Sequence, residues 1–308
     1  MNAGLFLWDF WQIHSAEGFR VLSLSADREL VAREQHHFSA RLALYHTQDF
    51  QTVSKLQRDV FCADPTVWDN TAIWSGDVVR WQGRYVLFYT SRNLQAGEMD
   101  QHIGMAEADD LAGPWARLPV ILSADSRYYQ TATDPAESSI HAWRDPFFFQ
   151  EDGKSYLLVA AKARGLPKNQ RGCIAVLRAE DDSLLRWRVL PPIYAPGTIG
   201  EIELPQLYRK SNGALVLCFN SHEKHDAGIR ERKGGFYAMD FMDAIMSKDS
   251  AQVELLATTE DTGLYGFRVI PELDGRIVGF HLQDGGPAST SIKTGWSSAN
   301  QELRSEGE

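Results

Sequence analysis

The sequence predicts an all-β protein, and within that class a five-bladed β-propeller with an axial pocket. Three observations lead to this fold. Short apolar, β-branched or aromatic runs recur along the chain, the runs are spaced by roughly 60 to 70 residues, and helical patterns are scarce. A period of that length holds about four strands, which make one propeller blade. A generic β-sandwich would also give short strands with turns, but the length of 308 residues and the long repeat favour the propeller.

Four of the apolar runs begin at a turn that contains glycine, and we expect each to be a hairpin turn that enters a buried strand. They are "QGRYVLFYTSR" from Gln82, "DGKSYLLVAAKAR" from Asp152, "SNGALVLCFNSH" from Ser211 and "DGRIVGFHLQD" from Asp274. A fifth, weaker copy, "SARLALYHTQD" from Ser39, lacks the glycine turn. After two of the copies, at Ile103 and Ile174, the chain continues with a strand, an acidic turn, a tryptophan and another strand. Five such units predict five blades.

The remaining segments complete this picture. One short helix is expected within "FYAMDFMDAIMSKDS" from Phe236, and a second near "REQHHFSARL" from Arg33. No linker or low-complexity stretch interrupts the chain, so we expect one catalytic domain over residues 1–308, with a polar tail from about residue 298 that frays.

The three cysteines have no CxxC spacing and predict buried thiols, not a disulfide framework or a zinc site. They are Cys62, Cys173 and Cys218.

Charge and hydropathy exclude several classes of partner. The formal net charge is -10 and no basic block occurs, which argues against nucleic acid and anionic membranes. The chain contains no run of about 18 apolar residues that would predict a membrane span. The N-terminus has no basic region, and its apolar run is interrupted by an acid, so we expect a cytoplasmic protein, or a secreted one if a leader has been trimmed.

Three acids stand out because each lies within an apolar or rigid frame. They are Asp9 in "LWDFW", Asp145 in "WRDPFFF" and Glu203 in "EIELPQ". Burying a carboxylate among aromatic side chains is costly unless it is paired or has a function. A lone acid of this kind is more often a paired structural residue. Three of them, which we expect in three successive blades, predict acids that converge at one end of the propeller axis.

Converging carboxylates are typical of a glycosidase active site. One carboxylate attacks the anomeric carbon, and a second protonates the departing oxygen. A separation of about 5–5.5 Å between the two implies retention through a covalent intermediate. A third acid can bind sugar hydroxyls and strengthen that contact as the transition state develops.

Five motifs appear in order and together resemble glycoside hydrolase family 68, the group of levansucrases, inulosucrases and bacterial β-fructofuranosidases, whose clan also contains the family 32 invertases. The motifs are "LWDFW", "WSG" from Trp74, "WRDPFFF", "EIELPQ" and "GLYGF" from Gly263, and they span Trp8 to Phe267. The resemblance implies that Asp9 is the nucleophile, that Asp145 stabilises the transition state, and that Glu203 is the general acid/base.

The same resemblance implies a set of substrate contacts. Trp8 and Trp74 would form the walls of the fructosyl pocket, with apolar faces for the sugar to pack on. Ser75 would donate a hydrogen bond to the nucleophile and hold its rotamer. Tyr265 would donate a hydrogen bond near the nucleophile.

Arg144 would pair with acids in the pocket and bind sugar hydroxyls, and Glu201 would face the leaving-group sugar. Two positions depart from the family pattern: Leu204 stands where Arg usually follows the acid/base, and Asp77 stands where a small residue usually follows "WSG". Both positions bear on the leaving-group subsite. The chain is also shorter than a typical levansucrase, which favours hydrolysis or transfer to small acceptors over long polymers.

The sequence therefore predicts a retaining β-fructofuranosidase or fructosyltransferase that acts on sucrose or a related small saccharide, with no cofactor and no metal. One alternative is another five-bladed furanosidase, such as an arabinofuranosidase, against which "WDFW" and "GLYGF" speak. Another is a non-catalytic sugar-binding propeller, which would typically have lost one of the three acids. The histidines of "SHEKHD", His222 and His225, do not form HExxH and predict a solvated loop at the substrate rim, not a metal site.

Overall fold

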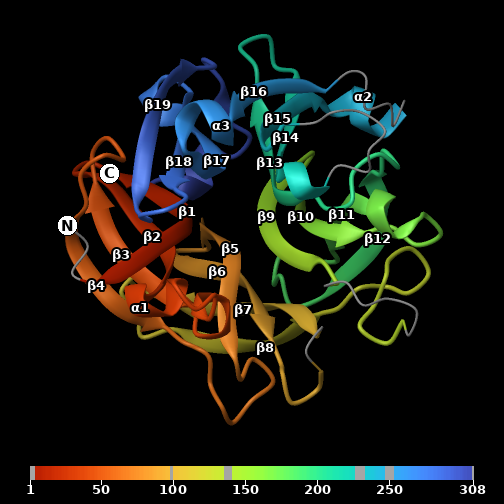
Figure 1. The fold of residues 1–308 in the computed structure, drawn as a ribbon, viewed down its shortest axis with the longest axis horizontal. Helices are drawn as coiled ribbons and strands as arrows, with labels where there is room; N and C mark the ends of the chain where they lie inside the picture. Colours follow the sequence, from red (N-terminus) through yellow and green to blue (C-terminus); the bar gives the residue numbers. More distant parts are fainter. Residues whose placement is uncertain (1–3, 98–99, 135–140, 226–232, 247–252, 307–308) are drawn as a thin grey trace.

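Five antiparallel sheets surround a central channel in the computed structural model, which describes residues 4–97, 100–134, 141–225, 233–246 and 253–306 (Figure 1). Each sheet is one blade, and the blades follow one another in chain order around the ring. The prediction of an all-β, five-bladed propeller is confirmed. The five apolar runs expected to be strands coincide with β3, β6, β10, β14 and β18, defined below.

The strands are distributed over the blades as follows. Blade 1 contains β1 (Leu5–Ser15), β2 (Gly18–Asp27), β3 (Arg41–Thr47) and β4 (Ser54–Phe61). Blade 2 contains β5 (Ala72–Trp81), β6 (Arg84–Arg92), β7 (Gln101–Ala108) and β8 (Ala116–Leu122). Blade 3 contains β9 (Trp143–Glu151), β10 (Lys154–Lys162), β11 (Gly172–Ala179) and β12 (Trp187–Tyr194). Blade 4 contains β13 (Glu203–Arg209), β14 (Leu215–Ser221), β15 (Gly235–Asp240), β16 (Glu254–Thr258) and β20 (Ser297–Ser298). Blade 5 contains β17 (Leu264–Ile270), β18 (Arg276–His281) and β19 (Pro287–Lys293).

Helices in the described residues are short. The α-helices are α1 (Arg28–Val31), α2 (Phe241–Met246) and α3 (Thr259–Thr262), and the 3₁₀ helices are η1 (His36–Phe38), η2 (Lys168–Gln170), η3 (Glu223–His225), η5 (Pro271–Leu273) and η6 (Gln301–Arg304). The helix expected after Phe236 is α2, although its segment begins as strand β15. The helix expected near Arg33 is replaced by α1 and η1 on either side of it. None of the helices in the described ranges has the length and apolar character needed to cross a bilayer.

The hydrophobic core is divided among the junctions between blades. Five clusters of buried apolar side chains fill these junctions, one for each pair of neighbouring blades. At the junction of blades 2 and 3, for example, the rings of Phe88 and Phe148 stack with centroids 5.3 Å apart. Because every blade packs both of its faces, its central strands are nearly continuous apolar runs, which is why the sequence pattern was visible.

The first strand of each blade lies nearest the channel (Figure 1), and the pairing of every one of these strands with the next is interrupted. The register of the pairing shifts within each first hairpin, between Trp8 and Phe10 in β1 and between Trp74 and Gly76 in β5, and likewise in the β9, β13 and β17 hairpins. A β-bulge of this kind bends the strand and re-aims a side chain. The bulged segments of β1, β9, β13 and β17 contain residues with positive φ, which are Asp9 (22°), Asp145 (59°), Leu204 (48°) and Gly266 (62°). The five bulges therefore turn residues of the inner strands toward one end of the channel.

The C-terminal segment does not fray as we expected. Arg304, in η6, is buried and binds Asp77 of β5 through two hydrogen bonds of 2.5 and 2.6 Å. Glu306 accepts a hydrogen bond from Arg20 at 2.9 Å, so the segment also contacts blade 1. The prediction of a fraying tail from residue 298 is wrong for residues 299–306, because their polar side chains find partners on distant blades.

Candidate active site

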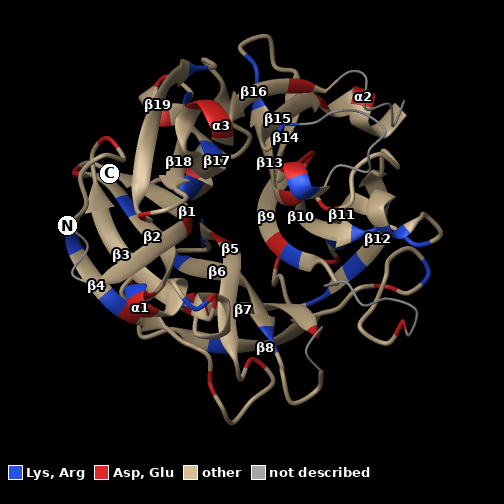
Figure 2. Cartoon of the chain, in the orientation of Figure 1, with Lys and Arg blue, Asp and Glu red and all other residues tan. Residues whose placement is uncertain are grey.

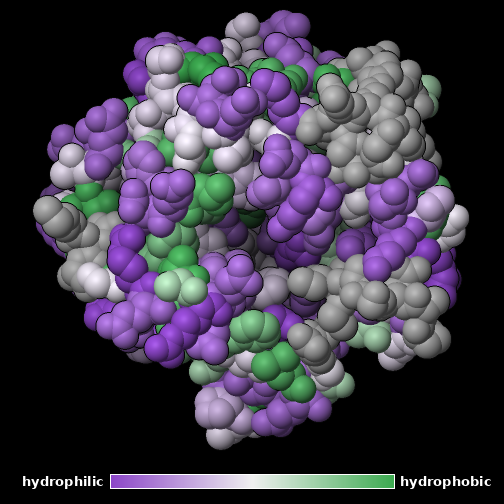
Figure 3. Space-filling view, viewed as in Figure 1, coloured by the Kyte–Doolittle hydropathy of each residue, from purple (hydrophilic) through white to green (hydrophobic). Residues whose placement is uncertain are grey.

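The acids singled out in the sequence meet in one pocket. A cavity of about 550 Å³ opens at the end of the channel toward which the bulges turn, and Asp9, Asp145 and Glu203 all line it. Figure 3 shows this hollow at the centre of the molecule. Figure 2 shows acidic and basic residues on the strands that border the channel, as well as at the periphery of the ring.

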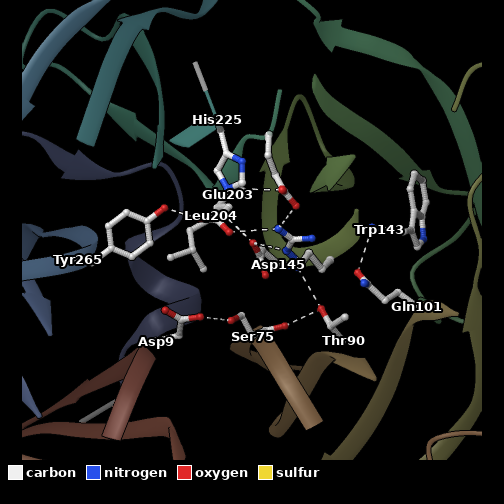
Figure 4. A network of polar contacts seen from close by, with 12 residues as sticks. Asp9, Ser75, Thr90, Gln101, Trp143, Asp145, Glu203, Leu204, His225 and Tyr265 are labelled. Atoms are coloured by element: carbon white, nitrogen blue, oxygen red, sulfur yellow. Dashed lines mark hydrogen bonds and ion pairs between the residues drawn. The ribbon is translucent and has the colours of Figure 1, made fainter. Parts of the chain in front are cut away.

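The distribution of the acids over the blades differs from the expected one. Asp9 lies in blade 1, Asp145 in blade 3 and Glu203 in blade 4, so they do not come from three successive blades. The bulges of the other two blades supply neutral hydrogen-bond donors to the same site, Ser75 from blade 2 and Tyr265 from blade 5. All five blades thus contribute to the pocket, as Figure 4 shows.

Asp9 is fixed by groups from its two neighbouring blades. The Ser75 hydroxyl donates a hydrogen bond to Asp9 Oδ2. On the other side lies Gly266, where a Cβ atom would stand only 3.0 Å from Asp9 Oδ1. Burial raises the pKa of Asp9 to about 6, and the Ser75 bond opposes that rise. At neutral pH the side chain is therefore mainly a carboxylate, held in one rotamer and partly open to the pocket.

Arg144 is the cation shared by the other acids. Its Nη2 donates to Glu201 Oε1 and, at 3.1 Å, to Glu203 Oε1, and its Nε lies 3.7 Å from Asp145 Oδ2. Burial opposes the charge of this guanidinium, but the three carboxylates raise the pKa of Arg144 above its ordinary value. The implied pairing of Arg144 with pocket acids is therefore present, and one arginine sets the positions of three carboxylates.

Asp145 is held by backbone and hydroxyl groups. Its Oδ2 accepts a hydrogen bond from the backbone N–H of Leu204 at 3.0 Å. Its own N–H donates to Thr90 Oγ1 at 3.0 Å, and the Thr90 hydroxyl donates to the backbone carbonyl of Ser75 at 2.8 Å. Burial raises the pKa of Asp145 to about 7, against the effect of Arg144. A chain of polar contacts thus connects Asp145 with the segment that holds Asp9 (Figure 4).

Tyr265 binds a different acid from the one expected. We expected its hydrogen bond beside Asp9, but its hydroxyl donates to Glu203 Oε2. Burial and the nearby Glu203 charge raise the pKa of Tyr265, so its hydroxyl stays protonated and able to donate. Glu203 is therefore held between a phenol on blade 5 and Arg144 on blade 3.

Glu201 lines the pocket, as the resemblance implies, but it is occupied by neighbours. Besides the Arg144 contact, its Oε2 lies 3.5 Å from His225 Nε2. Burial favours the neutral acid, yet Arg144, Lys162 and His225 outweigh it and hold the pKa of Glu201 at about 2. Glu201 is thus a permanent anion, and it orients Arg144.

Aromatic side chains form part of the pocket wall, including Trp8 and Trp74 as expected. The Trp74 indole N–H donates to the backbone carbonyl of His37 at 2.7 Å, which ties the wall to η1. His36 and His37 stack on each other with centroids 3.9 Å apart and face the pocket. Burial, with help from His36, lowers the pKa of His37 to about 4, so its ring is neutral. Sequence reasoning gave these two histidines no role in the site, because nothing local shows that η1 lies over the channel.

The two departures from the family 68 pattern have different outcomes. Asp77 does not line the pocket but lies fully buried beneath it, where it binds Arg304 and accepts a 2.8 Å hydrogen bond from the Phe148 N–H. Our expectation that Asp77 bears on the leaving-group subsite is therefore wrong. Leu204 does line the pocket, and its backbone conformation places its N–H on Asp145.

No metal-binding group is visible in the described parts of the chain, where no three His, Cys, Asp or Glu side chains are clustered. His222 and His225 lie at the pocket rim, on and beside η3, with ring centroids 6.3 Å apart. Cys173 and Cys218 are buried free thiols, as predicted, whereas Cys62 is half-buried.

Comparisons with known proteins match one family profile and several solved structures. The sequence profile described as glycosyl hydrolases family 43 matches residues 19–214, which begin after Asp9. No curated protein sequence matches the chain. The family matched is thus 43, which differs from the expected family 68, and the expectation of family 68 stays a prediction.

Several solved structures share the fold. An inulosucrase from Halalkalicoccus jeotgali bound to kestose is 19% identical with a TM-score of 0.68, over 91% of this chain and 76% of that one. The β-fructofuranosidase catalytic domain from Microbacterium saccharophilum K-1 is 19% identical with a TM-score of 0.63, over 90% and 74%. A levansucrase from Gluconacetobacter diazotrophicus is 18% identical with a TM-score of 0.68, over 96% and 80%. Similarity at this level of identity establishes the fold alone.

Proposed function

The chain belongs to glycosyl hydrolases family 43, and we propose that it is a retaining β-fructofuranosidase or fructosyltransferase acting on sucrose or a related β-fructoside. The observation that carries the proposal is the meeting of Asp9, Asp145 and Glu203 in one pocket, where Arg144 pairs with Asp145 and Glu203. The choice of a fructoside is supported by the family 68 motifs and by structural similarity to an inulosucrase, a levansucrase and a β-fructofuranosidase.

In the proposed first step, Asp9 attacks C2 of the fructosyl unit while Glu203 gives its proton to the departing oxygen. The bond between C2 and that oxygen breaks, and an ester forms between Asp9 and the fructosyl unit. In the second step Glu203 removes a proton from water or from an acceptor hydroxyl, whose oxygen attacks C2 and releases the Asp9 carboxylate. Asp145 contacts sugar hydroxyls and stabilises both transition states.

The contacts around each acid suit these roles. Ser75 and Gly266 restrict Asp9 to one orientation, which lowers the entropic barrier to attack. Tyr265 and Arg144 hold Glu203 from two sides. A carboxylate with hydrogen bonds from two fixed donors is already positioned before substrate binds, so little reorganisation is needed during the reaction.

A sugar panel tests the substrate. Sucrose, sucrose phosphate, inulin-type and levan-type oligomers and aryl arabinofuranosides are incubated with the protein, and released monosaccharide is measured. We expect release of fructose from at least one β-fructoside, with short transfer products and little high-mass levan. No turnover of any fructoside, with turnover of an arabinofuranoside, would overturn the proposal.

The retaining mechanism has its own test. We expect the first-formed fructose to have the configuration of the substrate, observed by NMR before mutarotation. Glu203→Gln is incubated with a fructoside whose leaving group departs without protonation, so that the ester still forms but breaks down slowly. Mass spectrometry of proteolytic peptides is then expected to find a fructosyl adduct on the peptide that contains Asp9. An inverted product, or an adduct elsewhere, would contradict the assignment of Asp9.

A second candidate is another furanosidase of the five-bladed type, such as an arabinofuranosidase. The family match supports it, because the matched profile is that of family 43 and not that of family 68. The arabinofuranoside arm of the panel distinguishes the two candidates. Tight saccharide binding without turnover of any substrate would instead favour the non-catalytic sugar-binding propeller.

A further inference from the structure

Beneath the pocket, the channel contains two buried arginines and one buried aspartate that the proposed reaction does not use. They are Arg268 on β17, Arg304 in η6 and Asp77 on β5, and each is at most 7% exposed. Arg304 binds both oxygens of Asp77. Arg268, in contrast, has no carboxylate within ion-pair distance among the described residues.

Two contacts place Arg268 behind Asp9. Its Nη2 lies 3.4 Å from the carbonyl oxygen of Gly76, the residue that follows Ser75, and Ser75 binds Asp9. Two residues before Arg268 on the same strand, Gly266 packs against Asp9 Oδ1. Arg268 does not line the active-site pocket. It lines a second, small cavity together with residues such as Gln12 and Arg304. The Arg268 side chain therefore lies outside the pocket, next to the two segments that hold Asp9.

Two carboxylates act on the Arg268 guanidinium, those of Asp77 and Asp9. Asp77 is neutralised by Arg304, and the pocket acids of blades 3 and 4 are neutralised by Arg144. Asp9 is the pocket acid without a cation in direct contact, among the residues that the structure describes. The buried Arg268 guanidinium is stabilised by the negative charge of Asp77 and, to a smaller extent, by that of Asp9.

We propose that Arg268 is a positioning residue that holds Asp9 ionised from beneath the pocket. The inference rests on the proposed role of Asp9 as the nucleophile. The groups that act on Asp9 are the Ser75 hydroxyl from β5, the Glu203 carboxylate from β13, Arg144 from β9, and Arg268 from β17. Glu203 and burial favour the neutral acid, whereas Ser75 and the two arginines favour the carboxylate. Removing Arg268 removes one of the three groups that oppose protonation.

Arg268→Met is the decisive variant, because methionine fills much of the same space without charge. The ionisation of Asp9 is followed by ¹³C NMR in protein labelled at aspartate carboxyl carbons, with Asp9→Asn to assign the signal. We expect the titration of Asp9, and the acidic limb of the pH profile of kcat/KM, to move to higher pH by about one unit. Arg268→Lys keeps the positive charge, so its Asp9 titration is expected to stay close to that of the unsubstituted protein. Arg186→Met, at an exposed arginine whose side chain is 71% accessible, serves as the matched control and should change neither.

An unchanged Asp9 titration in folded Arg268→Met would overturn the proposal. If that variant does not fold, Arg268→Gln is read in the same way, since its amide can still donate to the Gly76 carbonyl. Failure of Met, Gln and Lys variants to fold would also overturn the proposal, by showing that Arg268 serves the fold. The NMR titration needs no substrate, so a protein that shows the shift but cleaves no fructoside would contradict the proposed function and not the link between Arg268 and Asp9.

Discussion

The Ser75 hydroxyl donates a hydrogen bond to the Asp9 carboxylate across the junction between blades 1 and 2. Both residues lie at the bulges of their strands, where the register of the first hairpin shifts. The Ser75 backbone carbonyl in turn accepts a hydrogen bond from Thr90. The orientation of the proposed nucleophile therefore depends on how two blades meet.

Removing the Ser75 hydroxyl should weaken the site without disturbing the fold. In Ser75→Ala the pKa of Asp9 should rise, because a bond that favours the carboxylate is lost. We expect kcat/KM at neutral pH to fall by about 10- to 100-fold, the effect of a hydrogen bond to a charged group, and its acidic limb to move to higher pH. Ser54→Ala, which removes an exposed hydroxyl, is the control. An unchanged pH profile would argue against the proposed role of the Ser75 bond.

A methyl group at Gly266 should displace the nucleophile. A Cβ atom there would lie 3.0 Å from Asp9 Oδ1 and 2.5 Å from the Phe280 ring, so Gly266→Ala is expected to lower kcat by about 100-fold or more, the effect of misplacing a reacting group. Gly263→Ala is a matched control, because Gly263 also has positive φ but open space around its Cβ position. Both variants carry similar backbone strain, and comparable activity in the two would show that the clash with Asp9 has no effect.

Replacing the nucleophile should stabilise the protein at alkaline pH. The pKa of Asp9 is raised from 3.8 to about 6 on folding, so folding favours its neutral form and its ionisation above pH 6 opposes folding. Asp9→Asn should nearly abolish turnover and raise the free energy of unfolding at pH 8 by about 1 kcal/mol, a value reduced because Asp9 is partly open to solvent. The gain should vanish below pH 3.8. Thermal unfolding as a function of pH measures it, and a loss of stability at pH 8 would contradict the direction of the shift.

Breaking the pair beneath the pocket should destabilise the whole ring. Arg304→Met leaves the Asp77 carboxylate buried without its cation, and we expect a loss of about 3–5 kcal/mol in denaturant unfolding. Asp77→Asn combined with Arg304→Met should recover part of that loss, because the unpaired charge is gone. Arg127→Met breaks an exposed ion pair with Asp125 and should leave the free energy of unfolding nearly unchanged. Similar effects of the two single variants would disagree with a structural role for Arg304.

The fold class could be predicted from sequence because each blade buries both faces of its central strands, as the run around Leu157 and Val159 illustrates. The C-terminal segment could not be predicted. Asp77 and Arg304 are separated by 227 positions, and a polar tail carries no local sign that its arginine will be buried. Only the closed ring brings the two side chains together.

The same distinction applies to the site. Asp9, Asp145 and Glu203 were visible because each acid interrupts an apolar stretch. Gly266 and Arg268 were missed although "GLYGF" includes the glycine. The proximity of Gly266 to Asp9 depends on how blade 5 meets blade 1, and the contact of Arg268 with Gly76 depends on how blade 5 lies relative to blade 2. The expected partner of Tyr265 was wrong for a related reason: a motif identifies a donor, but the twist of the blades decides which acceptor it reaches.

Each inner strand brings only one piece of the chemistry to its kink, and no blade holds enough to cleave a bond by itself. Catalytic activity consequently requires the complete ring of five blades. During refolding, the circular dichroism signal of β-structure would recover as individual blades formed. Catalytic activity would return only after blade 5 had packed against blade 1.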